Sequence, residues 1–114
     1  MNPIERAKLL AEDIRQSEEY KIFAQYKEET DADEGIKSLL REYARMQTQI
    51  QLSAAAGQQA DADLMQRFSS LSSILYSDPR TSGYLLAQLR LQKMTVDILQ
   101  IIGGVSGLDL GLTL

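Results

Sequence analysis

The chain has 114 residues, of which 44% are apolar and 25% are charged, a profile typical of one globular domain. The net charge is −4 and the sequence contains no basic run, so direct binding to nucleic acid or to an anionic membrane surface is disfavoured. Histidine and cysteine are both absent. Their absence removes the usual neutral-pH general base, thiol catalysis and the common ligands of zinc and iron–sulfur sites.

Catalytic motifs are also missing from the sequence. Four of the seven glycines fall in the last twelve residues, after the expected last helix, and so cannot form a phosphate-binding loop between a strand and a helix. The serines of residues 69–73 have no lysine nearby in sequence that could serve as a base. We therefore predict a protein that is not an enzyme, has no catalytic residue, and needs no cofactor, metal or small-molecule substrate.

The sequence also gives an expectation about location. No segment approaches the ~20 consecutive apolar residues that are needed to span a bilayer. Residues 1–6 lack the long apolar stretch of a signal peptide. With no cysteine available for disulfides, we predict a cytoplasmic protein.

The sequence pattern of the N-terminal third predicts two consecutive helical segments. Asn2 and Pro3 are typical of a helix cap and a first helical position. The pattern restarts at Ser17, and the sequence leaves open whether residues 16–17 are a true break or a bend in one helix. The apolar face of the first segment consists of Ile4, Ala7, Ala11 and Ile14.

The middle of the chain predicts two more helices. The stretch 31–34 contains capping residues and opens a regular helix that could run to about Ala56. Gly57 marks a turn, and the next helix starts near Asp61. The apolar faces of these two helices are Ile36, Leu39, Leu40, Tyr43, Met46 and Ile50 in the first, and Leu64, Phe68, Leu71 and Leu75 in the second.

A fifth helix begins at Asp78 and Pro79 and is apolar over roughly two-thirds of its circumference. Such a helix is either central to its own bundle or shared with another chain, and we favour sharing, most simply in a homodimer. One stripe consists of Tyr84, Ala87, Leu91, Met94, Ile98 and Ile101, and the other of Leu85, Leu89, Val96 and Leu99. The interface that we predict consists of Tyr84, Leu85, Leu89, Val96 and Leu99.

The pattern predicts an all-α fold: a bundle of about five helices with long antiparallel helical hairpins, forming a dimer. The glycines from Gly103 onward break the helical pattern, so we divide the chain into a bundle domain over 1–103 and a Gly/Leu-rich tail over 104–114. Apolar residues alternate in this tail, which fits either an extended peptide that docks on a partner or a tail packed across its own bundle.

The order and spacing of several stretches across residues 4–102 resemble the YlbF/YmcA/YheA family of small helical bacterial proteins, first tied to competence regulation. No single motif carries the resemblance, and the middle of the chain looks most like the YheA branch. The matching stretches are Leu10–Ile14, Ser17–Tyr20, Tyr26–Glu34, the residues Leu40, Tyr43, Gln47 and Gly57, and Asp78–Gln88.

The resemblance implies a helical bundle that self-associates or pairs with relatives and that has no catalytic residues. In the better-known branch it implies a regulatory complex that adjusts a membrane-anchored endoribonuclease acting on messenger RNA, with effects on competence, sporulation and biofilm formation. The iron–sulfur clusters associated with that complex need cysteines, which this chain lacks. The role of the YheA branch is less defined.

Residues and resemblance together predict a non-catalytic adaptor or regulatory protein that acts through protein–protein contacts. A structural or chaperone-like helical oligomer is the alternative, because a wide apolar helix and adaptable methionines could shield the apolar surfaces of other proteins. One defined partner would favour the adaptor, whereas protection of many unrelated proteins would favour the chaperone-like oligomer.

Overall fold

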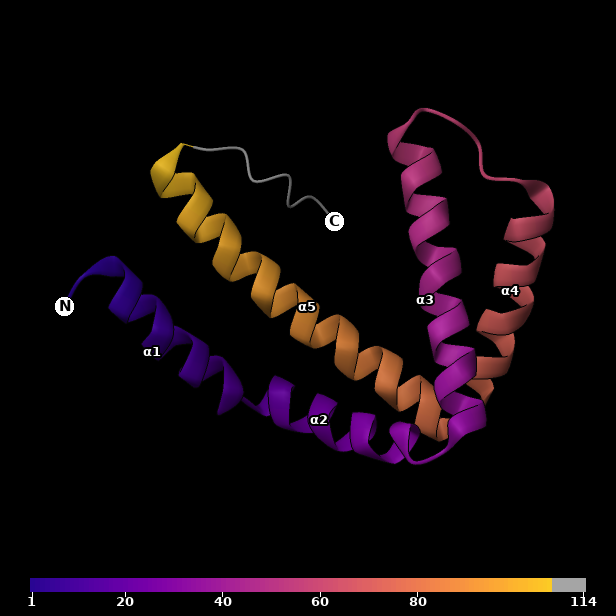
Figure 1. Ribbon diagram of the computed structural model, residues 1–114, viewed down its shortest axis with the longest axis horizontal. Helices are drawn as coiled ribbons and strands as arrows, with labels where there is room; N and C mark the ends of the chain where they lie inside the picture. Colours follow the sequence, from indigo (N-terminus) through magenta and orange to yellow (C-terminus); the bar gives the residue numbers. More distant parts are fainter. Residues whose placement is uncertain (108–114) are drawn as a thin grey trace. The chain divides into compact units, whose positions relative to one another are not determined.

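The computed structural model describes residues 1–107, and all of the regular structure in that range is helical (Figure 1). The all-α class that the sequence predicts is confirmed. The helices are α1 (Pro3–Arg15), α2 (Glu18–Asp31), α3 (Glu34–Ala55), α4 (Ala62–Ser77) and α5 (Pro79–Ser106).

The helix starts lie where the capping residues predict them. The Asn2 side chain accepts a hydrogen bond from the Glu5 backbone N–H at 2.8 Å. Asp33 caps α3 in the same way, accepting from the Ile36 N–H at 3.2 Å. Each cap satisfies one of the backbone donors that the first turn of a helix leaves unpaired.

The chain has a true break between α1 and α2, which settles the question that the sequence left open. The Ser17 hydroxyl oxygen accepts a hydrogen bond from the Tyr20 backbone N–H at 3.2 Å and donates one to the Ile14 carbonyl at 2.6 Å. Ser17 therefore caps α2 while it also satisfies a carbonyl at the end of α1.

Helix α5 is longer than the sequence predicts. It continues through Gly103 and Gly104 to Ser106, and Gly107, with φ of +69°, follows its last turn. The prediction of a helix break at Gly103 is wrong, because glycine weakens a helix interior without forbidding it. The division into a domain over 1–103 and a tail over 104–114 stays a prediction, and the alternating leucines from Leu108 onward lie outside the described residues.

The chain divides into two compact units, and α2 and α5 each run from one into the other. The central unit, Tyr26–Tyr84, contains the antiparallel hairpin of α3 and α4 (Figure 1), which confirms the predicted hairpin arrangement for this pair. The rings of Tyr43 and Phe68 stack between the two helices, with centroids 4.7 Å apart. The buried side chains of this hairpin are Ile36, Tyr43, Met46, Leu64, Leu71 and Leu75.

The central unit is also tightly packed where its ends meet. Thr30 and Thr81 are buried, and the Thr81 hydroxyl donates a hydrogen bond to the Leu75 carbonyl, so neither threonine leaves an unsatisfied polar group. Gly83 lies directly against the ring of Tyr26, where a Cβ would overlap ring atoms. Glycine at this position therefore allows the aromatic ring to approach the α5 backbone.

The terminal unit consists of Met1–Gln25 and the residues from Leu85 onward. It contains α1, the first part of α2 and most of α5, and α1 runs opposite in direction to α5 (Figure 1). No residue of α1 is buried. In the described part of this unit the buried residues are Leu85, Ala87 and Gly103, all from α5.

Candidate protein-interaction surface

The predicted interface residues on α5 differ in how much surface they offer. Leu89 is 58% exposed, whereas Val96 and Leu99 are half-buried. These three residues follow one another at spacings of seven and three, which places them on one face of the helix.

The other two predicted interface residues are less available. Leu85 is only 8% exposed, so its side chain packs within the chain and offers little to a partner. Tyr84 belongs to the central unit and is half-buried, and one residue along a helix corresponds to about 100° of rotation from Leu85. The structure therefore groups Leu89, Val96 and Leu99, and separates Tyr84 and Leu85 from them. The interface assignment itself stays a prediction.

Helix α5 carries further exposed apolar residues outside the predicted interface, one near its start and three near its end. Val105 is 89% exposed, and it lies in the segment that the sequence assigned to a tail rather than to a helix. Ile101 already belongs to one of the predicted apolar stripes, and extending the predicted helix past Gly103 would have added Val105 to the helix. The residues are Leu86, Ile101, Ile102 and Val105.

Helix α1 presents a second unburied apolar face. Ile4, Ala7 and Ala11 are exposed and Ile14 is half-buried, although their spacing is that of a helix built to pack against another. The sequence identified this face but did not predict that it would stay uncovered within the chain.

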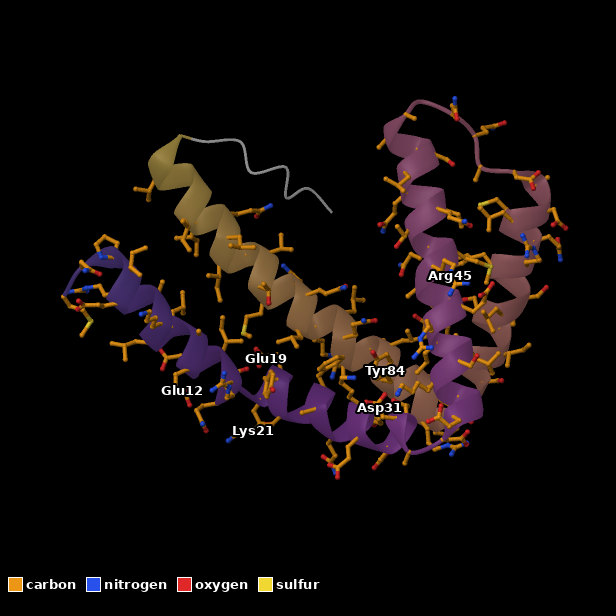
Figure 2. The ribbon with its side chains drawn as sticks, in the orientation of Figure 1. Glu12, Glu19, Lys21, Asp31, Arg45 and Tyr84 are labelled. Atoms are coloured by element: carbon orange, nitrogen blue, oxygen red, sulfur yellow. The ribbon has the colours of Figure 1, made fainter. Side chains whose placement is uncertain are left out.

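A shallow hollow of about 160 Å³ lies within the terminal unit between the start of α2 and α5. Its apolar lining comes from Ile22 and Ala87, and its charged lining from Glu18, Glu19 and Arg90. Figure 2 labels Glu19, which with Glu18 belongs to the first turn of α2, where acidic side chains favourably oppose the helix dipole. The hollow contains no nucleophile paired with a base, so its residues offer binding contacts rather than a reaction.

One ion pair, between Lys27 and Asp31, acts on Tyr84, which is labelled in Figure 2. Lys27 and Asp31 form an ion pair at 3.0 Å on the outside of α2; hydrogen bonding between them lowers the pKa of Asp31 and raises that of Lys27. Burial raises the pKa of Tyr84, with the positive charge of Lys27 acting in the opposite direction. These shifts come from ordinary pairing and burial.

The described residues also lack the groupings that other functions need. Within residues 1–107, no three acidic side chains come together as a metal site would require. No helix in that range is long and apolar enough to cross a membrane.

Comparison with known proteins identifies the family. A family model described as control of competence regulator ComK, YlbF/YmcA, matches residues 4–105, nearly the whole described chain. This chain belongs to that family. The resemblance seen in the sequence is thereby confirmed.

Individual relatives agree with this assignment. A UPF0342 protein of Desulfitobacterium hafniense is 33% identical over 103 residues, covering 90% of this chain and 83% of the relative. UPF0342 proteins of Halothermothrix orenii and Symbiobacterium thermophilum are 28% and 25% identical, and this chain covers 86% and 97% of their lengths. The family is described by its link to a competence regulator, and its description names no catalytic activity.

Proposed function

We propose that this protein is a non-catalytic regulatory adaptor that binds other proteins through its terminal unit, above all through the exposed apolar face of α5. The observation that carries the proposal is the exposure of Leu89 at 58%, on a face shared with Val96 and Leu99. An apolar face that stays partly open to water, here through Leu89, is typical of a surface that another protein covers.

The family supports the regulatory part of the proposal. Its description links it to the control of ComK, a competence regulator. We further propose that the adaptor works in a complex that modulates an endoribonuclease, with effects on competence, sporulation and biofilm formation. This finer assignment rests on family membership alone, and the partners of this chain are to be found by experiment.

The chain offers a closely matched pair of variants for that experiment. Leu89 in the terminal unit and Ile74 in α4 are both apolar, both helical and both 58% exposed. Replacing either one by glutamate places the same charge at the same degree of exposure. An effect seen only for Leu89→Glu therefore reports on the surface around Leu89 and not on charge or exposure in general.

The test is a crosslinked affinity pull-down from the native host, with bound proteins identified by mass spectrometry. We expect one or two defined proteins that wild type and Ile74→Glu retain and that Leu89→Glu loses. An endoribonuclease or a family relative among them would support the finer assignment. Recovery of many unrelated proteins that both variants retain would contradict the adaptor and support the chaperone-like oligomer.

A further inference from the structure

The hollow beside the start of α2 contains the smallest member of an apolar stripe on α5. Ala87 belongs to the stripe that continues with Leu91 and Met94, and its short side chain leaves space where a leucine would fill it. Ala87 is only 3% exposed, so it lines the deeper part of the hollow. Ile22 of α2 supplies the rest of the apolar lining. The base of the hollow is therefore apolar.

The rim of the hollow carries charges of both signs. Glu18 and Glu19 lie four and three residues before Ile22 on α2 (Figure 2), and Arg90 lies three residues after Ala87 on α5. These spacings place each charged side chain beside the apolar residue of its own helix. Two carboxylates and one guanidinium give the lining a net charge of −1.

The charged groups of this rim have no ionic partner among residues 1–107. Neither Glu18, Glu19 nor Arg90 forms an ion pair there. By contrast, Lys93, one turn further along α5, is paired with Asp97 at 3.1 Å. The two carboxylates can therefore meet a positive charge from outside without first breaking an ion pair.

The size of the hollow limits what it can hold. Its volume is about 160 Å³, whereas pockets for cofactors and drug-sized molecules usually measure about 300–1,000 Å³. A single side chain of another protein is a better fit. Leu86, which is 47% exposed, lies four residues before Arg90 on the same face of α5, so a protein that covers Leu86 also reaches the hollow.

An apolar base under a negatively charged rim matches a lysine side chain. The carbon stem of lysine packs on apolar surface while its ammonium group stays at the charged end. Arginine fits less well, because the side chains of successive residues leave a helix about 100° apart, so Glu18 and Glu19 do not present the planar acceptor pair that a guanidinium prefers. Arg90, on the other helix, can donate hydrogen bonds to backbone carbonyls of the same partner segment.

We propose that the hollow lined by Glu18, Glu19, Ile22, Ala87 and Arg90 binds a lysine side chain of a different protein. The inference rests on the proposed function, because an adaptor must bind a partner, and it names the chemistry by which that partner is recognised. It also assigns a contact that is separate from Leu89. Binding at this rim weakens as salt is raised, since exposed charges are screened.

Purified protein tests the chemistry of the hollow with n-butylammonium, which reproduces the end of a lysine side chain. We expect it to shift the amide NMR signals of Ile22 and Ala87 with a Kd in the millimolar range, as befits a ligand of about five heavy atoms at an open site. Butyrate and n-butanol, which lack the positive charge, should bind about tenfold more weakly. Equal binding of n-butanol, or no shift with n-butylammonium, would overturn the proposal.

Helix α2 offers a matched control for the two carboxylates. Glu28 and Glu29 are also successive and exposed, but they do not line the hollow. Glu18→Gln/Glu19→Gln should weaken n-butylammonium binding about tenfold, whereas Glu28→Gln/Glu29→Gln should leave it unchanged. Circular dichroism checks that both variants keep their helices. Equal weakening in both would mean that the probe responds to overall charge and not to the hollow.

A carbodiimide crosslink identifies the residue that the hollow meets in the native host. The reagent activates a carboxylate, and a lysine amine in contact with it displaces the activating group, which leaves an amide between the two proteins. In the pull-down we expect peptides that join Glu18 or Glu19 to a lysine of another protein, and none that join Glu28 or Glu29. Crosslinks confined to lysines of this same chain would overturn the proposal.

The lysine site and the adaptor fail in different ways. If a defined partner is lost by Leu89→Glu but kept by Glu18→Gln/Glu19→Gln, with no crosslink at Glu18 or Glu19, the adaptor stands and the lysine site is wrong. If n-butylammonium binds as expected but the pull-down recovers no defined partner, the adaptor is contradicted while the preference of the hollow for a cationic side chain is upheld.

Discussion

The central and terminal units are built from equally regular helices but differ in what those helices bury. In the central unit α3 and α4 enclose six large apolar side chains and a stacked aromatic pair. In the terminal unit α1 has no buried residue, and α5 leaves Leu89 and Val105 largely open to water. Helical periodicity therefore guarantees an apolar face but not its burial, because burial depends on what the rest of the fold places against that face.

The largest effect is expected when the same side-chain atoms are removed from each unit. Leu75 is 1% exposed, and Leu75→Ala should lower the free energy of unfolding by about 3 kcal/mol, through lost burial and the cavity left behind. Leu89→Ala should change it by less than about 1 kcal/mol, because the Leu89 side chain is already 58% exposed. Denaturant unfolding measures both values. Equal losses would mean that Leu89 is part of a core.

Glycine substitution gives the next largest contrast. A Cβ at Gly83 would overlap the Tyr26 ring, whereas a Cβ at Gly104 would meet open space. We expect Gly83→Ala to destabilise the protein by about 1–3 kcal/mol through overpacking. Gly104→Ala should stabilise α5 by about 0.5–1 kcal/mol, since alanine is the better helix former. Thermal unfolding compares the two, and stabilisation by Gly83→Ala would show that the Tyr26 ring moves aside at little cost.

The two helix caps sharpen the comparison at a smaller scale. Asp33→Ala removes the cap of α3, and the free energy of unfolding of the central unit should fall by about 1 kcal/mol. Asn2→Ala removes an equivalent cap from α1. Because α1 contains no buried residue, the global free energy of unfolding should barely change, while hydrogen exchange near the start of α1 becomes faster. A large loss of global stability in Asn2→Ala would contradict the description of α1 as uncovered.

The smallest expected effect is a dependence on alkaline pH in the central unit. Burial raises the pKa of Tyr84 above its ordinary value of 10.0, so the folded state keeps the phenolic proton longer than the unfolded state does. The stability from this group is complete below pH about 10 and is lost as pH rises through the folded pKa.

The free energy of unfolding, measured between pH 9 and 11.5, gives the slope of stability against pH. Tyr84→Phe should reduce this slope. The pKa of Tyr76 is raised as well, first by burial and then by Tyr43, so Tyr76→Phe serves as the comparison variant. An unchanged slope in both variants would contradict the assignment to these phenols.

Local chemistry explains why the sequence predicted most helix boundaries. A cap such as Asn2 or Asp33 acts within three residues of its own position, so its effect is visible in sequence alone. The end of α5 was predicted less well, because helix propensity at Gly103 and Gly104 is a weak preference that a long helix overrides.

The candidate surface was only partly predictable for a related reason. Helical spacing gave the faces that contain Leu89 and Ile4, but spacing is the same for a buried face and an exposed one. Leu85 and Leu89 share one stripe in the sequence, and the structure buries the first while it leaves the second 58% exposed.

By itself, the sequence determined the helical class, the caps, the lack of histidine and cysteine chemistry, and the family pattern, since each depends on residue identity and short-range spacing. Only the tertiary structure decided which apolar faces are covered, because burial depends on residues distant in sequence. The packing of Gly83 against Tyr26 could not be read from either residue alone. The absence of a buried residue in α1 is likewise a tertiary fact, since the spacing of its apolar residues is that of a helix whose face is covered.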